Sequence, residues 1–326
     1  MPKSPKKESG SPMMTRFVDE VEPWWDENHS PGTFPSRTRG VNGAFPDVHY
    51  TCVKSTTKAK NVLVIIPGWN ESYIKYKENF YDLCSKKYLA GTCDIWMMDH
   101  CSQGLSGRWG PNHKRGWTTD FQNYVRDIDY FVKEVVFAGK GKGSKVSDKD
   151  TTDVPKASEN ETSSCQERLD LWNRTRKANE TVCSGGVTWG WLWTSEWNRI
   201  DENTLTSEMV ANLNQTKIQL MCCEGETICA NSNMKTFAGG VKECDLVMVG
   251  GSRHEAFMEF DPQRDFFWGE CVKFWQGKKD KDRKGAVEWT AKPAKFLALK
   301  NLAILALVVY VWWFFASRIL AMLGLL

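Results

Sequence analysis

Short apolar runs and helical repeats of apolar positions alternate along most of this chain. Continuous apolar runs are typical of strands buried on both faces of a sheet. They lie at residues 61–67 (NVLVIIP), 94–99 (DIWMMD), 217–223 (KIQLMCC) and 245–249 (DLVMV). Helical repeats predict amphipathic helices over residues 75–87, 119–136 and 262–277. Because strands alternate with helices, we expect right-handed crossovers and a mostly parallel sheet flanked by helices, which makes an α/β domain.

We place this domain at residues 15–277, after a polar tail of residues 1–14 that has too few apolar residues for a core. Residues 138–164 are rich first in Gly and Lys and then in Ser, Thr, Asp and Glu, without any periodicity. This composition predicts a solvent-exposed loop. Residues 165–215 follow with a helical, tryptophan-rich pattern.

The end of the chain is strongly apolar. Residues 278–301 are basic, and residues 302–326 read LAILALVVYVWWFFAS, Arg318 and ILAMLGLL. A helix of that length measures roughly 37 Å and exceeds a hydrocarbon core of about 30 Å. Arg318 can extend to the interface. We therefore expect residues 278–301 to be a juxtamembrane linker and residues 302–326 a single-pass anchor in a mitochondrial or endoplasmic reticulum membrane.

Charge and cysteine content narrow the function classes. The chain has 43 basic and 40 acidic residues, and these are spread along it, which argues against a nucleic-acid partner. Its eleven cysteines include no C-x-x-C pair and no zinc-like Cys/His spacing. We expect reduced thiols, no metal and no cofactor.

Three stretches carry a resemblance to a known family. They are IIPGWNESYIKY at 65–76, MDHCSQGLSGRWGPNHKRGWTTDFQNYVRDIDYFV at 98–132 and GGSRHEAFMEFDPQRDFFW at 250–268. Together they resemble the lysophospholipase and monoacylglycerol-lipase branch of the α/β-hydrolases, also called serine-aminopeptidase-like. The resemblance implies an α/β-hydrolase fold and makes residues 165–215 a lid-like segment.

The resemblance also assigns candidate site residues. His254 occupies the position of the catalytic histidine, and Glu226 is the best match to the acid that orients it. Gly68 and Trp69 lie where the family supplies oxyanion N–H groups.

The nucleophile has no counterpart. Between Tyr130 and Cys165, where the family has its serine elbow, no G-x-S-x-G motif occurs. The substitutes lack the strand, turn and helix that expose a nucleophile; they are Cys101, Ser102, Ser144 and Ser184. We interpret His254 and Glu226 as vestigial. With a whole strand–helix–strand unit missing, we expect a condensed sheet in which residues 217–223 pair beside residues 61–66.

These features favour a protein without hydrolase activity. The first hypothesis is a membrane-anchored pseudoenzyme that serves as an interaction or accessory subunit of a membrane complex, with the lipid bilayer and other proteins as its partners. Two alternatives stay open: a lysophospholipase- or monoacylglycerol-lipase-type enzyme with an unrecognised nucleophile, and a truncated isoform of one.

Overall fold

A computed structural model describes residues 11–59, 61–84, 88–89, 91–112, 115–143, 162–178, 182, 206–242 and 244–277. The chain divides into two compact units, Met1–Arg283 and Lys284–Leu326, and all the described residues belong to the first. No helix in these ranges is long and apolar enough to cross a membrane. The predicted anchor at residues 302–326 lies outside them.

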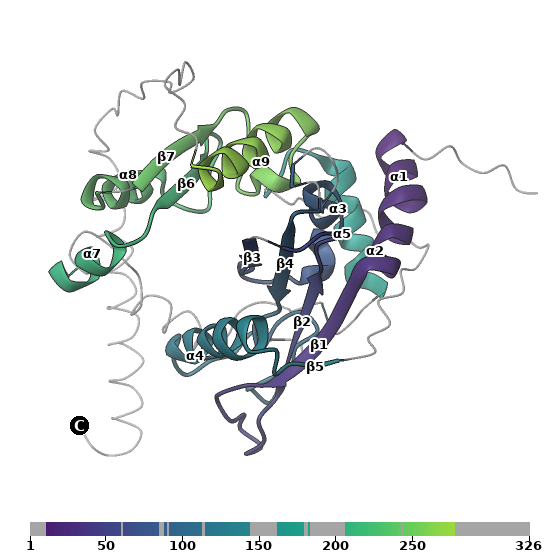
Figure 1. The fold of residues 1–326 in the computed structure, drawn as a ribbon, viewed down its shortest axis with the longest axis vertical. Helices are drawn as coiled ribbons and strands as arrows, with labels where there is room; N and C mark the ends of the chain where they lie inside the picture. Colours follow the sequence, from purple (N-terminus) through teal and green to yellow (C-terminus); the bar gives the residue numbers. More distant parts are fainter. Residues whose placement is uncertain are drawn as a thin grey trace, which may run out of the picture. The chain divides into compact units, whose positions relative to one another are not determined.

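The first sheet has five strands in the order β3-β4-β2-β1-β5 (Figure 1). Only β3 and β4 pair in parallel, with Asn61 opposite Cys93; the other three pairings are antiparallel. The short strand β5 lies within the segment predicted as a loop at 138–164. The strands are β1 (His29–Pro35), β2 (Asp47–Val53), β3 (Asn61–Ile65), β4 (Cys93–Met98) and β5 (Lys142–Gly143).

A second sheet consists of two parallel strands, β6 (Ile218–Cys223) and β7 (Cys244–Val249). Ile218 lies opposite Cys244, and the pairing continues to the last residue of both strands. The four apolar runs that predicted strands are thus confirmed as β3, β4, β6 and β7.

The helices follow the predicted repeats. The repeat at 75–87 forms η2 and α3, that at 119–136 forms α4 and η3, and that at 262–277 forms α9. Within residues 165–215 the structure describes two helices, α5 and α7. The bounds are α1 (Pro12–Arg16), η1 (Phe17–Val21), α2 (Glu22–Asn28), η2 (Tyr73–Tyr76), α3 (Lys77–Cys84), α4 (Gln122–Tyr130), η3 (Phe131–Phe137), α5 (Gln166–Ala178), α7 (Ser207–Leu213), α8 (Asn231–Gly240), η4 (Ala256–Met258) and α9 (Asp261–Trp275).

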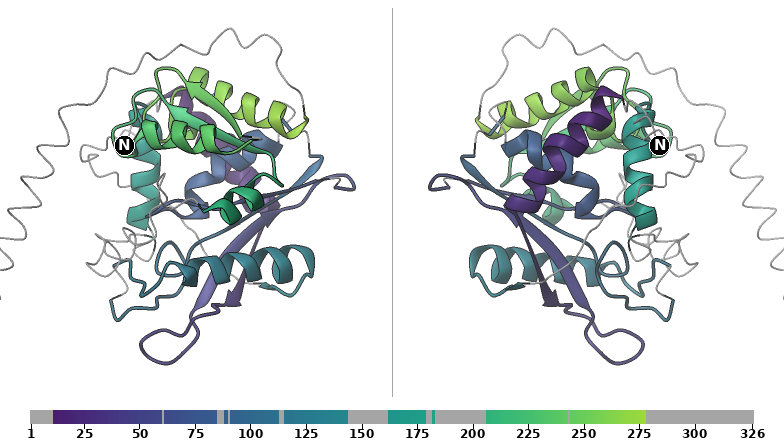
Figure 2. Two further views of the ribbon diagram at one scale, coloured as in Figure 1. Left: turned by 90° about the vertical axis from the view of Figure 1, so that its left-hand side faces the viewer. Right: turned by 90° about the vertical axis from the view of Figure 1, so that its right-hand side faces the viewer.

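Strand β4 divides the core between its two faces. Ile95 and Met97 pack into a cluster that includes Phe80 of α3. Trp96 and Met98 pack into another, which includes Phe131. Successive side chains of a strand point to opposite faces, so this fully apolar strand is covered on both sides. α4 lies on one side of the strands and α3 on the other (Figure 1; Figure 2 gives two further views).

The prediction of a condensed, mostly parallel sheet is wrong for the described residues. β6 pairs with β7 and not with β3, and the two sheets stay separate. Strand β3 is consequently an edge, and the prediction that its run is buried on both faces is wrong as well. Val62 is 37% exposed and Ile66 just beyond the strand is 40% exposed.

Buried polar contacts hold helix α9 against α3. In α9, Arg264 donates to Asp82 and, at 3.0 Å, to Asn79 of α3, and Trp268 donates to Asn79 at 3.1 Å. These polar groups are buried, and separating them would leave charges without partners. The contact joins the helix that follows β7 to the helix that follows β3.

Candidate functional site

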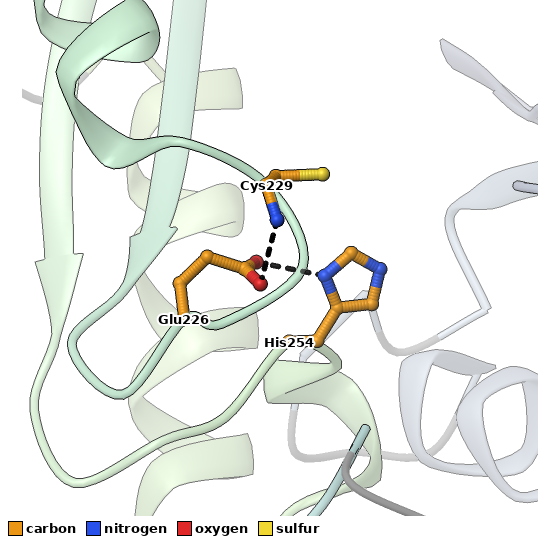
Figure 3. A group of neighbouring side chains, drawn as sticks. All are labelled: Glu226, Cys229 and His254. Carbon is orange, nitrogen blue, oxygen red and sulfur yellow. Dashed lines mark hydrogen bonds and ion pairs between the residues drawn. The ribbon is translucent and has the colours of Figure 1, made fainter. Parts of the chain in front are cut away.

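The candidate site lies where β6 and β7 end. Parallel neighbours have their carboxyl ends at the same edge, so the turn after β6 and the loop after β7 meet there. Glu226 lies in the turn and His254 in the loop, and Glu226 Oε2 is 2.7 Å from His254 Nδ1 (Figure 3). The structure therefore brings together the two residues that the sequence resemblance paired.

The turn itself positions the carboxylate. Glu226 Oε1 accepts backbone N–H groups from Ile228 at 2.7 Å and from Cys229 at 3.0 Å. Burial raises the pKa of the Glu226 carboxyl, but these two donors and His254 outweigh it and hold the pKa below its ordinary value. An ionised carboxylate accepts only, so Nδ1 of His254 donates to it. The side chain of Glu226 is 3% exposed and that of His254 is 30% exposed.

The oxyanion candidates belong to the loop after β3. The N–H of Gly68 donates to Glu71 Oε2 at 2.6 Å, so this amide already has a partner. Glu71 also accepts from Lys75 at 2.8 Å, and Lys75 forms a second ion pair with Glu255 at 2.7 Å. Although burial lowers it, the pKa of Lys75 is raised overall by the two carboxylates. The chain Glu71–Lys75–Glu255 ties the Gly68 loop to the residue beside His254.

Ser102 and Cys101 have structural roles in the loop after β4. Ser102 is buried at a φ of 71°, and its hydroxyl accepts the backbone N–H of Trp109 at 3.2 Å. The thiol of Cys101 donates to the carbonyl of Gly107, and burial raises its pKa well above the ordinary value. Neither side chain is a suitable nucleophile. Ser144 and Ser184 lie outside the described residues.

Sequence reasoning missed two features of this region. One is Cys229, whose sulfur lies within 4.8 Å of ligand atoms of Glu226 and His254. The sequence signal that could have indicated Cys229 is its spacing from Glu226, E-x-x-C, within one turn.

The second feature is a cavity of about 480 Å³ beside the Gly68 loop. Burial lowers the pKa of His100 in its wall to about 4, so this imidazole is neutral at pH 7. Most of the lining is apolar and comes from the ends of β3 and β4 and from α4. It consists of Pro67, Gly68, Trp69, His100, Gln103, Phe121, Gln122, Tyr124, Val125 and Ile128.

Comparison with known proteins gives short sequence matches and a shared fold. No protein-family model matches the chain. Lysophospholipase L2 of Escherichia coli K12 is 38% identical over 78 residues, which are 24% of this chain and 22% of that protein. The lysophospholipase L2 of E. coli strain CFT073 matches to the same extent. The match thus spans under a quarter of the length of these curated relatives.

Solved structures cover more of the chain at low identity. A carboxyl esterase from Bacillus coagulans has a TM-score of 0.51 at 12% identity, over 76% of this chain and 98% of the esterase. A monoglyceride lipase variant from Saccharomyces cerevisiae has a TM-score of 0.45 at 13% identity, over 76% of this chain and 97% of the lipase. The chain has the α/β-hydrolase fold. The predicted resemblance to lysophospholipases is confirmed over the 78 residues that match lysophospholipase L2.

Proposed function

We propose that this chain is a membrane-anchored α/β-hydrolase-like protein without hydrolase activity, which acts as an interaction or accessory subunit of a membrane complex. The observation that carries the proposal is an acid–histidine pair in a chain whose sequence lacks the serine elbow. Glu226 holds His254 at 2.7 Å, while the sequence contains no G-x-S-x-G motif and Ser102 is committed to a buried turn. A general base needs an activated nucleophile beside it for acyl transfer. The sulfur that lies near His254 belongs to Cys229, and burial and Glu226 raise the pKa of this thiol, which disfavours the reactive thiolate.

The edge strand β3 supports the interaction role. Its apolar side chains are partly exposed, and its outer side has no strand partner among the described residues. Val125 of α4, which lines the cavity near this edge, is 51% exposed. Exposed apolar edges are where added strands or partner surfaces bind. A protein partner at β3 would cover this surface.

A second candidate function is lysophospholipid or monoacylglycerol hydrolysis with an unrecognised nucleophile. The specific observation in its favour is the apolar cavity beside Gly68 and Trp69, which would suit an acyl chain. The short match to lysophospholipase L2 is consistent with this substrate class.

The test is labelling of the folded, full-length protein with a serine-reactive fluorophosphonate, together with turnover of a lysophospholipid and a monoacylglycerol. The His254→Ala variant and heat-unfolded protein serve as controls. We expect neither labelling above the unfolded background nor turnover. Labelling and turnover that disappear in His254→Ala would replace the proposal with the hydrolase.

A further inference from the structure

Three side chains with metal-binding atoms converge at the end of the second sheet. Ligand atoms of Glu226, Cys229 and His254 all lie within 4.8 Å of one another (Figure 3). They come from two adjacent segments, since Glu226 and Cys229 share the turn after β6 and His254 follows β7. The parallel pairing of β6 and β7 therefore fixes the two sources of ligands relative to each other.

The turn presents its two ligands together. Oε1 of Glu226 accepts the N–H of Cys229, which fastens the backbone of the cysteine to the carboxylate three residues earlier. Oε2 remains on the side of His254. One carboxylate oxygen, one imidazole nitrogen and one sulfur thus lie within 4.8 Å of one another.

Cys229 differs from the other described cysteines in its accessibility. It is exposed, whereas the remaining nine are buried or half-buried. An exposed sulfur can rotate about its Cα–Cβ bond, and ligands around a tetrahedral ion lie roughly 3 to 4 Å apart. An ion at this place would replace the proton between Nδ1 of His254 and Oε2 of Glu226, and rotation of Cys229 would turn its sulfur toward the same ion.

We propose that Glu226, Cys229 and His254 bind a zinc ion. Mixed nitrogen, sulfur and oxygen ligands suit zinc, whereas magnesium and calcium prefer oxygen alone. Three protein ligands leave a fourth tetrahedral position for water. The sequence prediction of no metal rested on Cys/His spacing and overlooked a ligand set divided between two strand ends. The site goes beyond the proposed function, because it gives the acid and the histidine a role that needs no serine.

Cobalt(II), which substitutes for zinc, tests the proposal directly. Reduced, full-length protein is titrated with Co²⁺ while the sulfur-to-cobalt charge-transfer band in the near ultraviolet is recorded. We expect one equivalent to bind with this band and with the intense visible bands of tetrahedral cobalt. Addition of Zn²⁺ should abolish both.

Matched cysteine variants locate the ligand. Cys229→Ser should lose the charge-transfer band, whereas Cys244→Ser, which alters a half-buried thiol at the start of β7, should keep it. A band that persists in Cys229→Ser, or no band in wild type, would overturn the proposal.

Melting temperature gives a second readout that does not depend on sulfur. Zn²⁺ should raise the melting temperature of wild type and of Cys244→Ser, because an ion that binds only the folded state stabilises it. Glu226→Gln and His254→Gln should show at most a small part of this rise. Equal rises in all four proteins would place the ion elsewhere and refute the site.

Discussion

Glu78 is the residue on which the most distant parts of the chain converge. It accepts from Arg168 of α5 at 2.7 and 2.8 Å and from Arg16 of α1 at 2.7 Å. Arg264 of α9 lies 3.9 Å away. Burial raises the pKa of Glu78, but the three guanidinium groups outweigh it and lower the pKa to about 2. The ionised carboxylate therefore stabilises the folded state at neutral pH.

The stabilisation by Glu78 should depend on pH. The pKa of Glu78 is about 2 in the folded state and 4.5 ordinarily. Its contribution to the free energy of unfolding is therefore complete above pH 4.5 and is lost as the pH falls toward 2. We expect Glu78→Gln to lower the free energy of unfolding by roughly 3 kcal/mol at pH 7. The difference in unfolding free energy between wild type and Glu78→Gln should shrink as the pH falls from about 4.5 to about 2, as measured by urea unfolding.

Glu208→Gln is the control for this measurement. Glu208 is exposed on α7, and its substitution should change the unfolding free energy by no more than about 0.5 kcal/mol. If the unfolding free energies of wild type and Glu78→Gln differ by the same amount at every pH, the assigned ion pairs are contradicted.

At the scale of elements, β3 and β4 have similar apolar sequences but different surroundings. β4 is paired on both sides, with β3 and with β2, and five of its six residues are buried. β3 is paired on one side only, and none of its residues is buried. Composition alone does not distinguish them, since both runs are apolar; the difference lies in which strand has neighbours.

Hydrogen exchange should separate the two strands. About half of the N–H groups of an edge strand point away from its partner, and these exchange readily with solvent. We expect peptides covering 61–66 to exchange faster than peptides covering 93–98 in purified protein, as read by mass spectrometry. Equal protection would show that another chain or segment covers the edge. A partner that binds there should slow exchange in 61–66 without affecting 93–98.

At the scale of the whole molecule, membrane attachment is the prediction with the largest consequence. Residues 302–326 lie outside the described residues, so the argument rests on their length and apolarity. A second charge near the middle of this segment should weaken insertion, because an arginine there costs roughly 3 kcal/mol. We expect full-length wild type to resist carbonate extraction from membranes and Val311→Arg to be released in larger part.

Val311→Leu is the matched control, since it keeps the segment apolar. It should remain with the membrane as wild type does. Release of wild type by carbonate would refute an integral anchor. If wild type stays with the membrane, fractionation of cells that express it would decide between mitochondrial and endoplasmic reticulum membranes.

The sequence by itself determined the elements and the identity of the paired site residues. Apolar runs and helical repeats report burial along one strand or helix, and these local patterns predicted β3, β4, β6, β7, α4 and α9. The resemblance was enough to associate Glu226 with His254, because strand order carries both to one edge. Both predictions could be made without information on which helices and strands pack together.

Only the tertiary structure decided how the sheet is divided and what surrounds the histidine. β6 pairs with β7 and leaves β3 as an edge, contrary to the expected closure. Long-range contacts, such as those of Arg264 with Asp82 and Asn79, leave no periodic signal in the sequence. The sulfur of Cys229 comes near His254 through a turn that Glu226 closes with two backbone hydrogen bonds. Strand edges, buried ion pairs and converging ligands depend on contacts between segments far apart along the chain, and these arise only when the chain has folded.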